Sequence, residues 1–159
     1  MPLSDPEHWL LPMQRAIAEA EISATPCYGE VPVGAVVVDD TSGRIISATH
    51  NRKESKPSPV AHAEIMALEE AALTLGRWRL TGCTLVVSLE PCPMCLGAIM
   101  QARVDELIFG CHDPKREVSS NEQEYRFKSL KGYAEVFDNN HRRSEEHTSE
   151  LQSPDHLVC

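Results

Sequence analysis

The feature that most constrains this chain is a pair of cysteines three positions apart, Cys92 and Cys95, taken together with His62 about thirty residues earlier. The cysteines lie in Pro91-Cys92-Pro93-Met94-Cys95, directly after an apolar run. Two thiolates and one imidazole suit Zn²⁺, and three protein ligands leave a fourth position for water. Both segments are predicted to begin helices, so the fold must bring two helix starts together.

The C-x-x-C spacing alone is compatible with more than one kind of site. A redox pair or half of a structural zinc site has the same spacing, although no second C-x-x-C completes a four-cysteine site. The N-terminal residues do not resemble an export signal, so we expect a reducing compartment rather than a disulfide scaffold. The cysteines are scattered along the chain, at positions 27, 83, 92, 95, 111 and 159.

Glu64 lies two residues after His62, in the first turn of the same predicted helix. A carboxylate there can take a proton from metal-bound water and pass it to a leaving nitrogen. Acidic residues are also common at helix N-termini for electrostatic reasons, so Glu64 alone is not diagnostic. The remaining histidines are interpreted as packed or surface residues: His8, His50, His112, His141, His147 and His156.

The apolar patterns predict an α/β domain in which a hairpin is followed by alternating helices and strands. Helices are expected over residues 5–22, 61–75 and 93–103, with a short helix over 122–133. Strands are expected over residues 34–38, 44–49, 84–89 and 106–110. The first two strands form the predicted hairpin, and the later alternation favours parallel neighbours.

Two helices have apolar faces that identify the side expected to meet the core. In the first helix these residues are Trp9, Met13, Ala16, Ile17 and Ala20. In the second they are Ile65, Leu68, Ala72 and Leu75. Pro12 is expected to kink the first helix or mark a restart, and Gly76 to end the second.

These motifs resemble those of the zinc nucleobase deaminases. His62-Ala63-Glu64 with Pro91-Cys92-Pro93-Met94-Cys95 matches the H-x-E…P-C-x-x-C signature of that superfamily. Further segments resemble the bacterial tRNA-specific adenosine deaminase family, and the similarity runs from about residue 6 to Arg142. The segments that carry it are Glu30-Val31-Pro32-Val33-Gly34-Ala35, His50-Asn51-Arg52, Ala61-His62-Ala63-Glu64-Ile65, Leu89-Glu90-Pro91-Cys92 and Gly110-Cys111-His112-Asp113-Pro114-Lys115.

The resemblance implies a reaction and a metal centre. His62, Cys92 and Cys95 would hold one Zn²⁺ per chain, and Glu64 would carry protons. The implied enzyme is a hydrolase acting on C–N bonds of cyclic amidines. Water would replace the amine at C6 of adenosine at the wobble position of a tRNA anticodon loop, leaving inosine and ammonia.

The resemblance also implies the fold and the contacts to the base. We expect a cytidine-deaminase-like three-layer α/β/α sandwich with a mixed sheet, in a cytoplasmic homodimer. Asn51 would hydrogen-bond the base, and Val33, Gly34 and Ala35 would line its pocket. That segment is equally well interpreted as the start of a core strand, where Gly34 marks a bulge or the close approach of another group.

Two other functions stay open. A free-base or nucleoside deaminase is one, with guanine as the substrate because residues 91–99 also resemble that branch. A non-catalytic, zinc-stabilised binding scaffold is the other. The net charge of −9 argues against binding nucleic acid with the whole surface, but it permits a local basic face. Candidates for that face are Lys115, Arg116, Arg126, Lys128 and Lys131. No stretch approaches the ~20 apolar residues that span a bilayer, so we expect no membrane partner.

The end of the chain departs from the family. Residues 116–120 stand where the family has a glycine-rich turn, and the expected final strand and C-terminal helix do not follow Arg142. The residues from Arg143 onward resemble the conceptual translation of a sequencing adapter. We therefore expect a deaminase domain over residues 1–142, with that strand and helix missing, and a non-native tail over 143–159. The source DNA would test this expectation.

Overall fold

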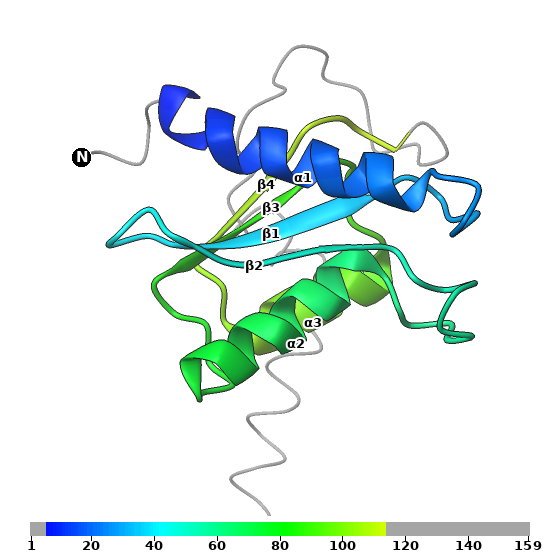
Figure 1. Cartoon of the computed structure of the whole chain (residues 1–159). Coiled ribbons are helices and arrows are strands. Elements are labelled where there is room, and N and C mark those ends of the chain that lie inside the picture. Colours follow the sequence, from blue (N-terminus) through cyan, green and yellow to red (C-terminus); the bar gives the residue numbers. More distant parts are fainter. Residues whose placement is uncertain (1–5, 114–159) are drawn as a thin grey trace, which may run out of the picture. The chain divides into compact units, whose positions relative to one another are not determined.

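The computed structural model describes residues 6–113 (Figure 1). The elements in chain order are η1 (Pro6–Trp9), α1 (Leu10–Ser23), β1 (Gly34–Asp39), β2 (Ile45–His50), α2 (Ala63–Leu75), β3 (Cys83–Val87), α3 (Pro93–Ala102) and β4 (Glu106–Phe109). Several predictions lie outside the described residues: the helix over 122–133, the basic residues from Lys115 onward, the domain boundary after Arg142, the missing final elements and the tail. No helix within residues 6–113 has the length and apolar content needed to cross a membrane.

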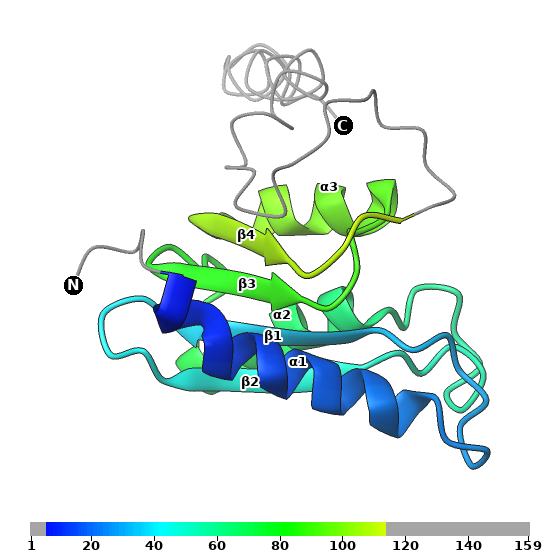
Figure 2. The same ribbon diagram turned by 90° about the horizontal axis from the view of Figure 1, so that it is seen from above.

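The described strands form one mixed sheet in the order β2-β1-β3-β4. Strand β1 pairs antiparallel with both β2 and β3, whereas β3 and β4 run parallel. Helix α1 covers one face of the sheet, and α2 and α3 cover the other (Figures 1 and 2). The predicted hairpin, the parallel pair and the three-layer α/β/α architecture are confirmed.

The two central strands are apolar because both of their faces are covered. The side chains of β1 and β3 that are fully buried include Val36, Val37, Val38, Leu85, Val86 and Val87. Against α1 the core is completed by Trp9, Ala16 and Ile108. The valine-rich runs that predicted buried strands therefore form the centre of the sheet.

Helix α1 differs from its prediction in two respects. The expected single helix is divided into η1 and α1, and Pro12 lies in the first turn of α1, where an N–H has no acceptor within the helix. Ile17 was expected to face the core but is 47% exposed, so that prediction is wrong. The buried stripe of the helix runs instead through Ala16, Glu19 and Ala20.

Helix α2 packs through small residues. Its buried positions are Ala63, Glu64, Ala67, Leu68 and Ala71, so alanines at four-residue spacing meet the sheet. The larger side chains predicted for this face are only partly buried, apart from Leu68. Gly76 ends the helix in the left-handed conformation, with φ of 64°, as predicted.

Replacing Asp40 by asparagine is expected to raise the thermal midpoint at pH 7 by about 1–4 °C. Burial raises the pKa of Asp40 and outweighs the hydrogen bond from Thr84 Oγ1, and the charges of Asp105 and Asp39 raise the pKa further. A carboxyl group whose pKa is raised on folding costs stability above that pKa. Asparagine removes the charge and keeps the acceptor oxygen.

The stabilisation by this variant should fade as the pH is lowered and disappear below about pH 3, where the wild-type carboxyl is protonated in both the folded and the unfolded state. Thermal denaturation followed by circular dichroism at about pH 3 and at pH 7 measures both effects. Glu70→Gln, at an exposed position of α2, is the control and should change neither midpoint. A lower midpoint for Asp40→Asn at pH 7 would contradict the prediction.

Candidate metal centre

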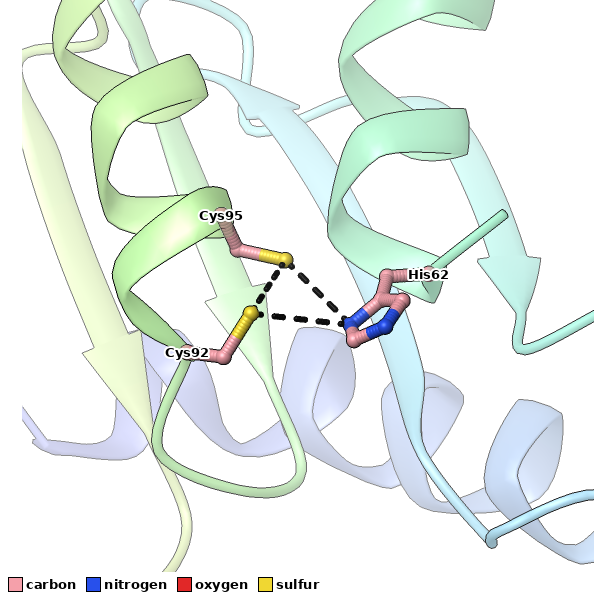
Figure 3. A group of neighbouring side chains, drawn as sticks. All are labelled: His62, Cys92 and Cys95. Carbon is pink, nitrogen blue, oxygen red and sulfur yellow. Dashed lines mark hydrogen bonds between the residues drawn. The ribbon is translucent and has the colours of Figure 1, made fainter. Parts of the chain in front are cut away.

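Three of the residues singled out in the sequence come together where two helices begin. His62 is the N-cap residue of α2, Cys92 is the N-cap residue of α3, and Cys95 lies in the first turn of α3 (Figure 3). The two sulfur atoms are 3.4 Å apart, and His62 Nδ1 lies 3.5 Å from Cys95 Sγ and 3.7 Å from Cys92 Sγ. Within residues 6–113 no other group of His, Cys, Asp and Glu side chains is compact enough to hold a metal ion.

The local sequence explains this geometry. Pro93 occupies the first turn of α3, where its fixed φ favours a helix start directly after Cys92. His62 and Cys92 both have extended backbone conformations, and neither side chain caps its own helix by a hydrogen bond. Their donor atoms face each other instead.

The three donors fit a tetrahedral zinc ion. Bond lengths of about 2.3 Å to sulfur and 2.0–2.1 Å to nitrogen require separations of about 3.8 Å between sulfurs and 3.6 Å between sulfur and nitrogen. The observed separations are within about 0.4 Å of these values. Burial raises the pKa of the Cys95 thiol, and negative charge on Glu64 and Cys92 raises it further. A divalent cation would supply the positive charge that a thiolate needs here.

Glu64 lies in the first turn of α2, immediately beside this group. Its side chain is only 3% exposed, and its charge acts on the Cys95 thiol. Glu64, His62 and Cys92 line the same cavity, which has a volume of about 130 Å³. The carboxylate predicted to carry protons is therefore held next to the three donors.

Of the four residues expected to contact a base, two line this cavity and two do not. Val33 and Asn51 are among its lining residues, whereas Gly34 and Ala35 are not. Ala35 is fully buried in the core, and Gly34 lies against α1. A Cβ atom on Gly34 would lie 2.0 Å from the carbonyl oxygen of Ala16. The close approach at Gly34 is therefore made by a helix.

Asn51 is buried and makes two hydrogen bonds that connect distant segments. Its Oδ1 accepts from the backbone N–H of Ala63 at 2.9 Å, and its Nδ2 donates to the carbonyl oxygen of Val31 at 2.9 Å. The side chain therefore ties the segment before β1 to the first turn of α2. A primary amide has two donors and two acceptor lone pairs, so one of each is left for a ligand.

Sequence reasoning assigned no role to the other polar residues of the cavity, Lys53, Glu90 and Asp113. Glu90 is buried, and its Oε2 lies 3.0 Å from His112 Nδ1 and 3.3 Å from the backbone nitrogen of Asp113. The backbone N–H of Glu90 donates to the carbonyl oxygen of Cys111. Glu90 thus holds residues 111–113 against the cavity. In the sequence, Glu90 directly follows a predicted buried strand, and burying a carboxylate there costs free energy unless it is hydrogen-bonded.

Residues 8–111 match the family described as the cytidine and deoxycytidylate deaminase zinc-binding region. The chain is 49% identical over 103 residues to a tRNA-specific adenosine deaminase of Bacillus subtilis (strain 168). The aligned region covers 65% of this chain and 62% of that relative. It is 48% identical over 98 residues to the chloroplastic tRNA(adenine(34)) deaminase of Arabidopsis thaliana, and the aligned region covers 62% of this chain and 7% of the plant protein.

Solved structures show the same similarity. A structure from a study of A-to-I editing by tRNA:A34 deaminases aligns with a TM-score of 0.62 and 42% identity, over 66% of this chain and 73% of that one. The X-ray structure of a guanine deaminase from Bacillus subtilis aligns with a TM-score of 0.61 and 27% identity, over 87% and 94% of the two chains. The resemblance inferred from the sequence motifs is confirmed.

Proposed function

Since the chain belongs to the cytidine and deoxycytidylate deaminase zinc-binding family, we propose that it is a zinc-dependent hydrolytic deaminase that converts adenosine to inosine at the wobble position of tRNA. The observation that carries this proposal is the convergence of His62, Cys92 and Cys95 beside a small cavity that Glu64 also lines. A metal centre beside a buried carboxylate is the combination that hydrolytic deamination needs.

The residues divide the chemistry between them. His62, Cys92 and Cys95 would hold one Zn²⁺ per chain, which when bound lowers the pKa of a water molecule to near neutrality. Glu64 would relay the two protons of the attacking water in turn, the first to N1 of the purine ring and the second, from the hydroxyl group formed at C6, to the leaving amine. Water and adenosine are consumed, and inosine and ammonia are produced, so no other reactant is required.

Val33 and Asn51 are proposed to contact the base. Both line the cavity, and Asn51 keeps one donor and one acceptor site beyond its two internal hydrogen bonds. Gly34 and Ala35 act behind this surface, since they pack into the core and against α1. Their contribution is to hold β1 in place rather than to touch the ligand.

The size of the cavity supports a single base as the part of the substrate that enters. A volume of about 130 Å³ is well below the 300–1,000 Å³ of pockets that enclose whole drug-sized ligands. A base in a single-stranded loop can leave its stack at low cost, which suits an anticodon loop. The relatives named for tRNA adenosine are also more similar to this chain than the guanine deaminase is. The homodimer and the cytoplasmic location remain predictions.

The proposal is tested by supplying the purified chain with four substrates: an anticodon stem-loop with adenosine at the wobble position, free adenosine, guanine and cytidine. Ammonia release, inosine content and bound zinc are measured together. We expect inosine in the stem-loop and little ammonia from the other three. Ammonia from guanine but not from RNA would favour the guanine deaminase alternative. Bound zinc without ammonia from any substrate would favour a binding scaffold.

A further inference from the structure

The segment between β2 and α2 places a lysine at the cavity. Lys53 is one of the lining residues, and its side chain is partly buried. The lining otherwise carries three carboxylates, on Glu64, Glu90 and Asp113, and no second lysine or arginine among the described residues. The ion pairs found within residues 6–113 do not involve Lys53.

A buried carboxylate fixes the conformation of the segment that carries Lys53. Glu30 is 7% exposed and accepts hydrogen bonds from the backbone N–H groups of Glu54 and Ser55 at 2.8 and 3.0 Å. Burial acts to raise the pKa of Glu30, but the hydrogen bonds from Ser55 and its neighbours lower it below its ordinary value. Glu30 is therefore ionised at neutral pH and anchors the turn.

Further backbone hydrogen bonds close the same turn. The N–H of Ser58 donates to the carbonyl oxygen of Lys53 at 3.1 Å. The N–H of Lys56 donates to the carbonyl oxygen of Arg52 at 2.9 Å. The N–H of Arg52 donates to the carbonyl oxygen of Ala61, next to His62. Lys53 is thus attached to a turn whose position is fixed relative to the start of α2. Because the backbone of this turn is ordered in advance, only the side chain of Lys53 must be ordered when it binds an anion.

Resting on the proposed function, we propose that Lys53 binds a phosphodiester of the nucleotide whose base enters the cavity. A base that occupies about 130 Å³ leaves its sugar and phosphate at the cavity mouth. A chain with a net charge of −9 repels RNA at long range, so phosphate binding requires a local cation. The three carboxylates of the lining exclude a phosphate elsewhere in the cavity, and Lys53 offers the ammonium group that phosphates accept.

The test compares Lys53→Met with Lys56→Met in the 159-residue chain. Methionine keeps an aliphatic side chain and removes the charge, and Lys56 is an exposed lysine of the same turn that does not line the cavity. The Kd for a fluorescent anticodon stem-loop is measured over a range of KCl concentrations, together with KM and kcat for inosine formation. Lys53→Met should raise Kd and KM about tenfold, keep kcat within about twofold and reduce the salt slope by about one.

Two comparisons make the outcome specific. Lys53→Arg should restore most of the affinity, because it restores the charge, and Lys56→Met should stay within about twofold of wild type. An unchanged Kd and salt slope in Lys53→Met, a fall confined to kcat, or no binding of the stem-loop by wild type would overturn the proposal. If wild type binds RNA through Lys53 but forms no inosine, the phosphate site stands and the proposed reaction fails.

Discussion

Glu64→Gln is expected to lower kcat by a factor of about 10²–10⁴ while the chain keeps its zinc. Glutamine has nearly the shape of glutamate, so the cavity beside His62 and Cys95 should keep its form. The amide cannot accept a proton from water at neutral pH or return one to a leaving amine. The change therefore removes proton transfer and leaves the three donors in place.

Turnover on the anticodon stem-loop and zinc per chain, measured by mass spectrometry, test this result together. Glu69→Gln is the matched control, because Glu69 is an exposed residue of the same helix. It should keep full activity and full zinc content. Activity of Glu64→Gln within about threefold of wild type would contradict the role given to Glu64. So would a loss of zinc that accounts for the loss of turnover.

Gly34→Ala is expected to destabilise the fold by about 3 kcal/mol or more, a large part of the 5–15 kcal/mol that stabilises a typical domain. The new methyl group would lie 2.0 Å from the oxygen of Ala16 and 2.7 Å from the nitrogen of Ala20. Both are backbone atoms of α1, so no side-chain rotation relieves the overlap. The helix must move away from the sheet and expose the core that it covers.

Urea denaturation followed by circular dichroism measures this effect through the midpoint. Gly97→Ala on α3 is the control, since a Cβ atom there has no neighbour within 4 Å. Alanine also has the higher helix propensity, so this variant should be neutral or more stable by about 0.5–1 kcal/mol. Equal midpoints for the two variants would show that α1 does not restrict Gly34.

The parts of this protein that were predictable from sequence are those encoded by neighbouring residues. The valine runs identified the central strands because a strand covered on both faces needs apolar residues throughout. The candidate metal donors could be predicted because Cys92 and Cys95 stand three positions apart in one motif and His62 belongs to a second. Gly76 was identified as a helix end because its left-handed conformation is a local property.

The parts that were not predictable depend on partners distant in the sequence. Ile17 lies on the apolar side of its helix, but the sheet is met by the stripe that includes Glu19. The sequence marked Gly34 as a place of close approach without identifying α1 as the neighbour. No local pattern indicates that Lys53 and Glu90 line the same cavity as Glu64, because the three residues come from separate segments of the chain.

Placing His62 and Cys92 at the N-cap positions of α2 and α3 carries a cost in stability. Serine, threonine, aspartate and asparagine are the residues that cap a helix start well, and such a cap contributes about 0.5–2 kcal/mol relative to alanine. Neither His62 nor Cys92 forms a side-chain cap. Helix α3 therefore lacks this stabilisation at its start, whereas α2 is partly compensated because Asn51 Oδ1 accepts the N–H of Ala63. Under selection for stability of the metal-free chain alone, aspartate or serine would be favoured at these two positions, and the three candidate metal donors would be lost while the fold remained.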